Sequence, residues 1–139
     1  MLDKWTHYFF SVAKLTANLS SANRLKVGAV LVRDKRILLC GYNGTPSGMN
    51  NNCEDENNDT RKEVLHAEEN LILYAAKCGI SLNNSTLFIT HSPCMSCAKL
   101  IYGAGIRTIF YLEDYRTNDG LEFLRSVGIE VNKNQFFNQ

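Results

Sequence analysis

The first twenty residues carry apolar side chains at helical spacing. Residues 4–19 are predicted to form a helix, because an apolar residue recurs every three or four positions. These positions are Trp5, Phe9, Val12, Leu15 and Leu19. Asp3 precedes them and is predicted to cap the helix, since its carboxylate can accept from free N–H groups. The segment also holds more aromatic side chains than one buried face needs, which indicates a subunit contact: Trp5, Tyr8, Phe9 and Phe10.

Two short apolar runs follow, over residues 27–32 and 37–42, with a polar turn at residues 34–35 between them. Runs of this length joined by a tight turn predict a β-hairpin. If the turn centres on residues 34–35, Lys26 faces Asn43 across the hairpin. The start of the first strand and the end of the second are therefore expected to lie side by side.

Helical and strand patterns alternate in the rest of the chain, after a long polar segment at residues 43–62. Helices are predicted over residues 63–78, 93–104 and 121–127, and strands over 86–90, 106–112 and 129–131. A single helix between two strands returns the chain in the same direction, so the later strands are predicted to be parallel. The predicted fold class is α/β: one domain, residues 1–139, with three α/β/α layers around a central five-stranded mixed sheet.

Composition narrows the class of protein. The 139 residues carry 15 Lys and Arg against 14 Asp and Glu, a formal net charge of +1. Near-balanced charge disfavours binding of long nucleic acids, which normally requires a basic excess. No segment has the apolar length of a membrane span, and residues 1–5 do not begin a signal peptide. A cytoplasmic domain without membrane contact is predicted.

The five cysteines need an explanation of their own. An odd number in a chain without a secretory signal argues against a disulfide framework and favours metal or catalytic thiols. Cys40 and Cys78 lie in apolar segments and are predicted to be core thiols. Cys53 lies in the polar segment, where its role stays open.

Three side chains have the chemistry of zinc ligands: His66, Cys94 and Cys97. Pro93 fixes the start of a helix whose first turn puts both sulfurs on one face. The positive end of that helix favours thiolates. His66 lies near the start of the preceding predicted helix. In a parallel arrangement both helix starts lie at one edge of the sheet, so the three ligands can converge.

Glu68 follows His66 by two positions and is predicted to stand beside the metal rather than to bind it. Three protein ligands with an open fourth position are typical of a catalytic zinc, and a nearby carboxylate suits general acid–base chemistry. One alternative is a redox-active cysteine pair. Another is a structural zinc site completed by a fourth ligand from Cys40, Cys53, Cys78 or His91.

The segments His66-Ala67-Glu68 and Pro93-Cys94-Met95-Ser96-Cys97 together resemble the signature of the zinc-dependent nucleoside and nucleotide deaminases. Four further segments resemble deoxycytidylate (dCMP) deaminases: residues 27–30, 41–48, 98–101 and 104–106. The resemblance implies a cytidine-deaminase-like fold and hydrolysis of dCMP to dUMP and ammonia, which supplies thymidylate synthesis. It also implies that His66, Cys94 and Cys97 hold zinc and that Glu68 moves the protons.

The same resemblance implies an assembly and its regulation. Members of this family are typically hexamers, activated by dCTP and inhibited by dTTP near subunit contacts, and Mg²⁺ would accompany such a triphosphate. Some hold a second, structural zinc through Cys and His residues in the loop before the catalytic helix. Here that loop offers Cys53 and no histidine, which disfavours a second zinc.

Substrate contacts are predicted near the zinc signature, at Asn43, Thr45, Ala67, Ser92, Tyr111 and Tyr115. The amide of Asn43 can bind a sugar hydroxyl or a base edge, and its alternative is a plain Asn-Gly turn. Tyr111 ends a predicted strand and is a candidate to stack on the pyrimidine, with core packing as its alternative.

Phosphate or effector contacts are predicted at nearby cations and at a glycine-rich turn: Arg24, Lys26, Gly44 and Arg116. Paired cations beside such a turn suit phosphate, and the alternative is a solvated basic rim. The rival functions are deamination of cytidine, of dCTP or of adenosine in tRNA. A different class of rival is a non-catalytic module in which zinc only joins two helices.

Overall fold

The computed structural model describes residues 3–135 and 137, which form four helices and five strands. In chain order these are α1 (Lys4–Ala17), β1 (Gly28–Arg33), β2 (Arg36–Tyr42), α2 (Ala67–Cys78), β3 (Thr86–His91), α3 (Met95–Gly103), β4 (Thr108–Glu113), α4 (Asp119–Ser126) and β5 (Glu130–Lys133). The strand order is β2-β1-β3-β4-β5. Strand β1 is antiparallel to both neighbours, and β3, β4 and β5 are parallel. The predicted mixed sheet is confirmed.

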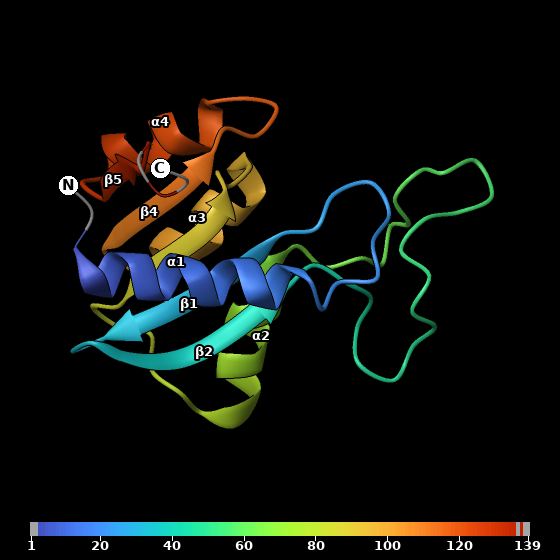
Figure 1. Ribbon diagram of the computed structural model, residues 1–139, viewed down its shortest axis with the longest axis horizontal. Helices are drawn as coiled ribbons and strands as arrows, with labels where there is room; N and C mark the ends of the chain where they lie inside the picture. The colour runs from blue at the N-terminus through green and yellow to red at the C-terminus, as the bar shows by residue number, and fades with distance from the viewer. Residues whose placement is uncertain (1–2, 136, 138–139) are drawn as a thin grey trace.

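Helices cover both faces of this sheet (Figure 1). Alternate strand residues point to opposite faces: Val30 and Phe88 pack beneath α1, whereas Leu31 and Ile89 face α2 and α3. Helix α4 joins α2 and α3 on the second face through Leu121, so the sheet is buried on both sides. This arrangement confirms the three predicted layers and explains why the strands read as nearly continuous apolar runs.

Helix α1 buries a different face from the one predicted. Asp3 caps it as expected, since its Oδ1 accepts from the backbone N–H of Thr6 at 2.9 Å. The buried residues are Phe9, Phe10, Ala13, Thr16 and Ala17, whereas Leu15 and Leu19 are 68% and 67% exposed. The cause is Gly28 on β1, where a Cβ would lie 1.9 Å from the carbonyl oxygen of Ala13. Small residues must therefore face the sheet here, and Phe9 and Phe10 belong to the core rather than to a subunit contact.

The hairpin forms where predicted, but its register differs by one residue. The two central turn residues have φ of 54° and 60°, as a tight hairpin turn requires. The pairing then shifts between Leu31 and Val32. As a result, the N–H of Asn43 donates to the carbonyl of Val27 at 3.3 Å, and Lys26 lies one position beyond the predicted pair.

The carboxyl ends of β2, β3 and β4 meet at one edge of the sheet, where α2 and α3 begin. Residues 43–66 form a long irregular segment that extends away from this edge (Figure 1). Helix α2 starts at Ala67 rather than at residue 63, and α3 starts at Met95 rather than at residue 93. Both starts therefore coincide with the predicted zinc ligands. In the described part of the chain, no helix is long and apolar enough to cross a membrane.

Candidate active site

His66 is held at the start of α2 by the chain on both sides. It is the N-cap residue, and its backbone N–H donates to Glu69 Oε1 at 2.8 Å. The preceding residue, Leu65, exchanges two backbone hydrogen bonds with Gly44 (2.8 and 3.0 Å). These contacts explain why the helix begins later than the apolar pattern predicts. They also fix the imidazole at the sheet edge.

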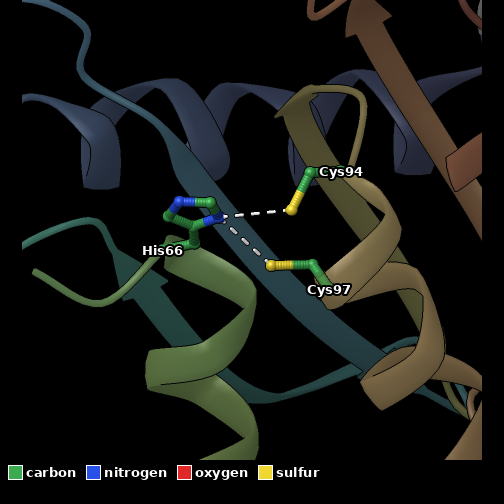
Figure 2. A group of neighbouring side chains, drawn as sticks. All are labelled: His66, Cys94 and Cys97. Carbon is green, nitrogen blue, oxygen red and sulfur yellow. Dashed lines mark hydrogen bonds between the residues drawn. The ribbon is translucent and has the colours of Figure 1, made fainter. Parts of the chain in front are cut away.

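The two cysteines occupy the corresponding start of α3. Cys94 is the N-cap residue after the buried Pro93, and its carbonyl accepts from the N–H of Ala98 at 2.8 Å. Cys97 lies in the first helical turn. His66 Nδ1 is 3.3 Å from Cys97 Sγ and 3.6 Å from Cys94 Sγ. The three side chains point toward one another from the starts of two neighbouring helices (Figure 2).

Gly120 on α4 packs against the loop that carries Pro93 and Cys94 before α3, here called the cysteine loop. The absence of a side chain at Gly120 lets this loop lie close to α4. A Cβ at this position would lie 2.4 Å from the carbonyl oxygen of Pro93 and 2.9 Å from that of Cys94. We expect Gly120→Ala to displace the loop and to weaken zinc binding by about 10- to 100-fold, the loss that follows when support of a metal ligand is removed. Zinc affinity is measured by competition with a chromophoric chelator.

Gly103→Ala is the matched control, because no heavy atom lies within 4 Å of its added Cβ. Equal zinc affinity in both variants would show that the loop tolerates the displacement.

The three donor atoms fit a tetrahedral zinc ion. Zinc bonds of about 2.1 Å to nitrogen and 2.3 Å to sulfur place ligand atoms roughly 3.6–3.8 Å apart. All three donors lie within 4.8 Å of one another, and no other such His/Cys/Asp/Glu cluster occurs among residues 3–135 and 137. Imidazole and thiolate are also the ligands that zinc prefers. The geometry therefore supports a site with three protein ligands.

The protonation states of the three side chains favour binding of a cation. Hydrogen bonds from Cys97 and His66 lower the pKa of Cys94 to about 4, so this sulfur is a thiolate at neutral pH. The thiolate in turn raises the pKa of His66 to about 9 and the pKa of Cys97 far above its usual range. Without metal the three groups share protons around one thiolate, and a bound divalent cation releases those protons.

Glu68 is almost fully buried beside the cluster. Burial raises the pKa of its carboxyl to about 7, against the opposing influence of its own backbone N–H and of His66. A carboxyl with a pKa near neutrality can both accept and release a proton, as a general acid–base group must. Its position in the first turn of α2 follows directly from the cap at His66.

A cavity of about 600 Å³ opens over the cluster. Its walls come from the chain before β1, the segment between β2 and α2, the cysteine loop and the loop after β4. Nine of the predicted site residues line it: Arg24, Asn43, His66, Ala67, Glu68, Ser92, Cys94, Tyr115 and Arg116. The cavity therefore combines a candidate metal centre, a buried carboxyl and two guanidinium groups.

A family model described as the cytidine and deoxycytidylate deaminase zinc-binding region matches residues 3–113. This chain belongs to that family. The deaminase is 39% identical to ComE operon protein 2 of Bacillus subtilis (strain 168) over 132 residues, which cover 91% of this chain and 69% of the relative. It is 34% identical over 146 residues to the deoxycytidylate deaminase of Saccharomyces cerevisiae, with 98% of this chain but only 46% of that protein covered.

The fold of the deaminase also agrees with a solved structure. The dCMP deaminase from the cyanophage S-TIM5, crystallised with dCMP and dUMP, superposes with a TM-score of 0.92 at 41% identity. The match covers 96% of this chain and 99% of that one. The cytidine-deaminase-like fold expected from the sequence is thus confirmed over nearly the full length.

Asn43 has a structural role in addition to the substrate contact predicted for it. Its Oδ1 accepts from the N–H of Val27, and its Nδ2 donates to the carbonyl of Leu25, both at 2.8 Å. The side chain thus joins the end of β2 to the strand entering β1. Because Asn43 also lines the cavity, it fixes the wall to which Arg24 belongs.

Four predicted contacts lie outside the cavity lining. Thr45 and Gly44 follow β2 and do not line the cavity. The backbone of Gly44 pairs with that of Leu65 in an antiparallel bridge. Lys26 instead lines a second cavity of about 170 Å³. Tyr111 is buried in the core, and its phenol contacts Asp114, so its packing alternative describes its position.

Sequence reasoning missed three cavity carboxylates: Glu54, Glu113 and Asp114. Glu113 and Asp114 follow the carboxyl end of β4, so the sheet-edge rule applied to Tyr115 could have found them. Glu54 lies in the irregular segment, where no periodicity indicates which side chains turn inward. His91, a candidate fourth ligand in the alternative of a structural zinc site, lines the cavity and contacts Glu113 Oε2 through Nε2 at 3.1 Å.

The prediction that Cys40 and Cys78 are core thiols is wrong. Cys40 and Cys78 are exposed, whereas Cys53 is buried. Cys40 lies on the edge strand β2, and Cys78 lies in the last turn of α2, so apolar neighbours in sequence do not cover them. Cys53 Sγ lies 3.5 Å from Ser21 Oγ and does not join the His66 cluster. The described residues therefore offer no fourth cysteine ligand at that cluster.

Proposed function

We propose that this chain hydrolyses dCMP to dUMP and ammonia. The observation that carries the proposal is the His66, Cys94 and Cys97 cluster beside the buried Glu68, at the base of a cavity that also presents cations. Support comes from the 41% identity to a dCMP deaminase whose structure contains both dCMP and dUMP. A cytoplasmic enzyme of this kind would supply dUMP for thymidylate synthesis.

His66, Cys94 and Cys97 would hold the zinc ion. Zinc at this site supplies Lewis acidity, which makes a water molecule nucleophilic near neutral pH. Glu68 accepts a proton from the water that attacks C4 of the pyrimidine, and it passes that proton to N3. The same carboxylate then takes the second proton from the hydroxyl group now bonded to C4 and passes it to the 4-amino group, which leaves as ammonia as the C4 carbonyl forms. One water is consumed, and each proton that Glu68 accepts is returned to the nucleotide.

The cavity walls supply groups for the rest of the nucleotide. Ser92 Oγ accepts from the N–H of Tyr115 at 2.7 Å, which fixes the loop after β4 against the cysteine loop. Arg24 and Arg116 present guanidinium groups that suit a 5′-phosphate. Ala67, Ser92 and Tyr115 are proposed to contact the base or sugar, together with Asn43 and Thr45. Tyr111 is not among these contacts, because it is buried in the core.

We also propose that the deaminase is a hexamer regulated by dCTP and dTTP. The support is the resemblance together with Lys26, which lines the second cavity beside Lys14 and His91. For a Mg²⁺ ion that would accompany a triphosphate, the described residues contain no second cluster of three or more His, Cys, Asp or Glu side chains. Sigmoidal dCMP kinetics that become hyperbolic with dCTP would support the regulation, and kinetics indifferent to both triphosphates would remove it.

A substrate panel tests the proposed function. The zinc-loaded protein is incubated with dCMP, deoxycytidine, cytidine, dCTP and a tRNA anticodon stem. We expect dCMP to have the highest kcat/KM, about 100-fold above that of deoxycytidine, because charge-assisted contacts to a phosphate contribute binding that the nucleoside lacks. Higher kcat/KM for cytidine or for tRNA would assign the site to that substrate. No turnover of any of them by folded, zinc-loaded protein would favour the non-catalytic module.

A further inference from the structure

Negative groups surround a cavity in which the substrate is proposed to be an anion. Besides Glu68, three carboxylates line it: Glu54, Glu113 and Asp114. Any of them that faced the nucleotide unpaired would repel its phosphate, and each would also compete with the phosphate for the guanidinium groups of Arg24 and Arg116. The partners of these carboxylates therefore bear on substrate recognition.

Two of the carboxylates are held by neutral donors. Glu54 Oε2 accepts from the backbone N–H groups of Asn23 and Arg24 at 3.0 and 3.2 Å. Glu113 Oε2 lies 3.1 Å from His91 Nε2, and burial lowers the pKa of this imidazole, which favours its neutral form. These contacts orient the carboxylates but leave their charge uncompensated.

Asp114 alone is paired with a formal cation. Its Oδ2 accepts from Lys133 Nζ at 2.6 Å, and the buried phenol of Tyr111 contacts the same carboxylate. Lys133 is the last residue of β5, so a neighbouring strand reaches across to the loop after β4. The ion pair both neutralises Asp114 and holds its side chain on the β5 side of that loop.

Asp114 is also the carboxylate nearest in sequence to Arg116, which lies two residues further along the same loop. Across residues 3–135 and 137, neither Arg116 nor Arg24 forms an ion pair. The Arg116 guanidinium instead lies over the ring of Tyr115, 5.6 Å from its centroid. Without Lys133, Arg116 is a cation on the same loop and in the same cavity lining that can pair with Asp114.

We propose that Lys133 is a positioning residue for anionic substrates: by engaging Asp114, it leaves Arg116 free to bind the phosphate group. This inference rests on the proposed action on a nucleoside monophosphate. Lys133 does not line the cavity, so it acts through Asp114 rather than by touching the substrate.

The Lys133→Met variant tests the inference, because it should raise KM for dCMP and leave kcat nearly unchanged. KM for dCMP is expected to rise about fivefold with kcat within twofold of the original, since the unpaired Asp114 then competes with the phosphate for Arg116 while the reacting atoms are unaffected. The kcat/KM for deoxycytidine, which carries no phosphate, should not change. The difference in KM should shrink at high ionic strength, because the groups are partly exposed and salt screens them.

Two further variants separate this role from a structural one. Lys133→Arg keeps the cation and should retain a KM within about twofold of the original. Adding Asp114→Asn to Lys133→Met removes the competing carboxylate and should restore a low KM. Lys77→Met is the charge-matched control, because Lys77 is exposed near the end of α2 opposite to His66. This control should leave KM unchanged.

Calorimetric titration with the product dUMP compares the affinities of the Lys133→Met and Lys77→Met variants without any turnover. Weaker dUMP binding by Lys133→Met than by Lys77→Met supports the inference, whatever the turnover rate. Equal dUMP affinity, or an equal rise in the KM of deoxycytidine and dCMP, would overturn it. If the original protein binds dUMP but does not convert dCMP, the proposed function fails while the positioning role of Lys133 is still measured.

Discussion

The Glu68→Gln variant is expected to lose about 10²- to 10⁴-fold in kcat for dCMP, the range that a positioned general acid–base group contributes. Glutamine has nearly the same shape but cannot accept the proton of the attacking water or return it to N3 and the amine. Because Glu68 is buried and its carboxyl is not a zinc ligand, zinc content and thermal stability should be retained. The measurement is steady-state formation of dUMP by protein with one zinc per chain.

Glu63→Gln is the matched control, since Glu63 is an exposed glutamate in the segment before α2. It makes the same chemical change outside the cavity and should keep the original kcat. If Glu68→Gln with full zinc retained kcat within tenfold of that control, the proton-transfer role of Glu68 would be wrong.

Loss of a zinc ligand is the second large effect. Cys97→Ser is expected to weaken zinc binding on the order of 10³-fold and to abolish turnover at stoichiometric zinc, because a hydroxyl is a poor substitute for thiolate. Cys97 is fully buried at the start of α3, so no solvent group can replace its sulfur. Zinc per chain is measured after gel filtration, together with activity.

Two other cysteines serve as controls for that experiment. Cys78→Ser alters an exposed thiol at the far end of α2 and should keep both zinc and activity. Cys53→Ser distinguishes a site with three protein ligands from one with four, because Cys53 is buried but lies outside the cluster. Zinc loss in Cys53→Ser, or full zinc retention in Cys97→Ser, would contradict the ligand assignment.

The strands and the metal ligands could be predicted from the sequence because each rests on a short, local pattern. Apolar runs mark strands that are buried on both faces, and the spacing of Cys94 and Cys97 depends on a single helical turn. The convergence of His66 with them follows from the parallel connection alone. These features need no knowledge of which side chains meet across the core.

The errors arise where a distant residue decides the outcome. Gly28 selects the small side chains of α1 over its leucines, although it lies in another element. The irregular pairing at Leu31 and Val32 shifts the hairpin register without a sign in the turn. The role of Asp114 depends on a distant residue in the same way, because its partner Lys133 lies on a strand formed later in the chain.

Conversion of dCMP in ¹⁸O-labelled water tests the central claim most directly. The zinc-loaded protein is predicted to release one ammonia per dUMP formed, with one solvent oxygen at C4 of the product, and chelation of zinc should stop the reaction. Formation of no dUMP by folded protein with one zinc per chain would contradict the account. So would dUMP formation at an undiminished rate by metal-free protein.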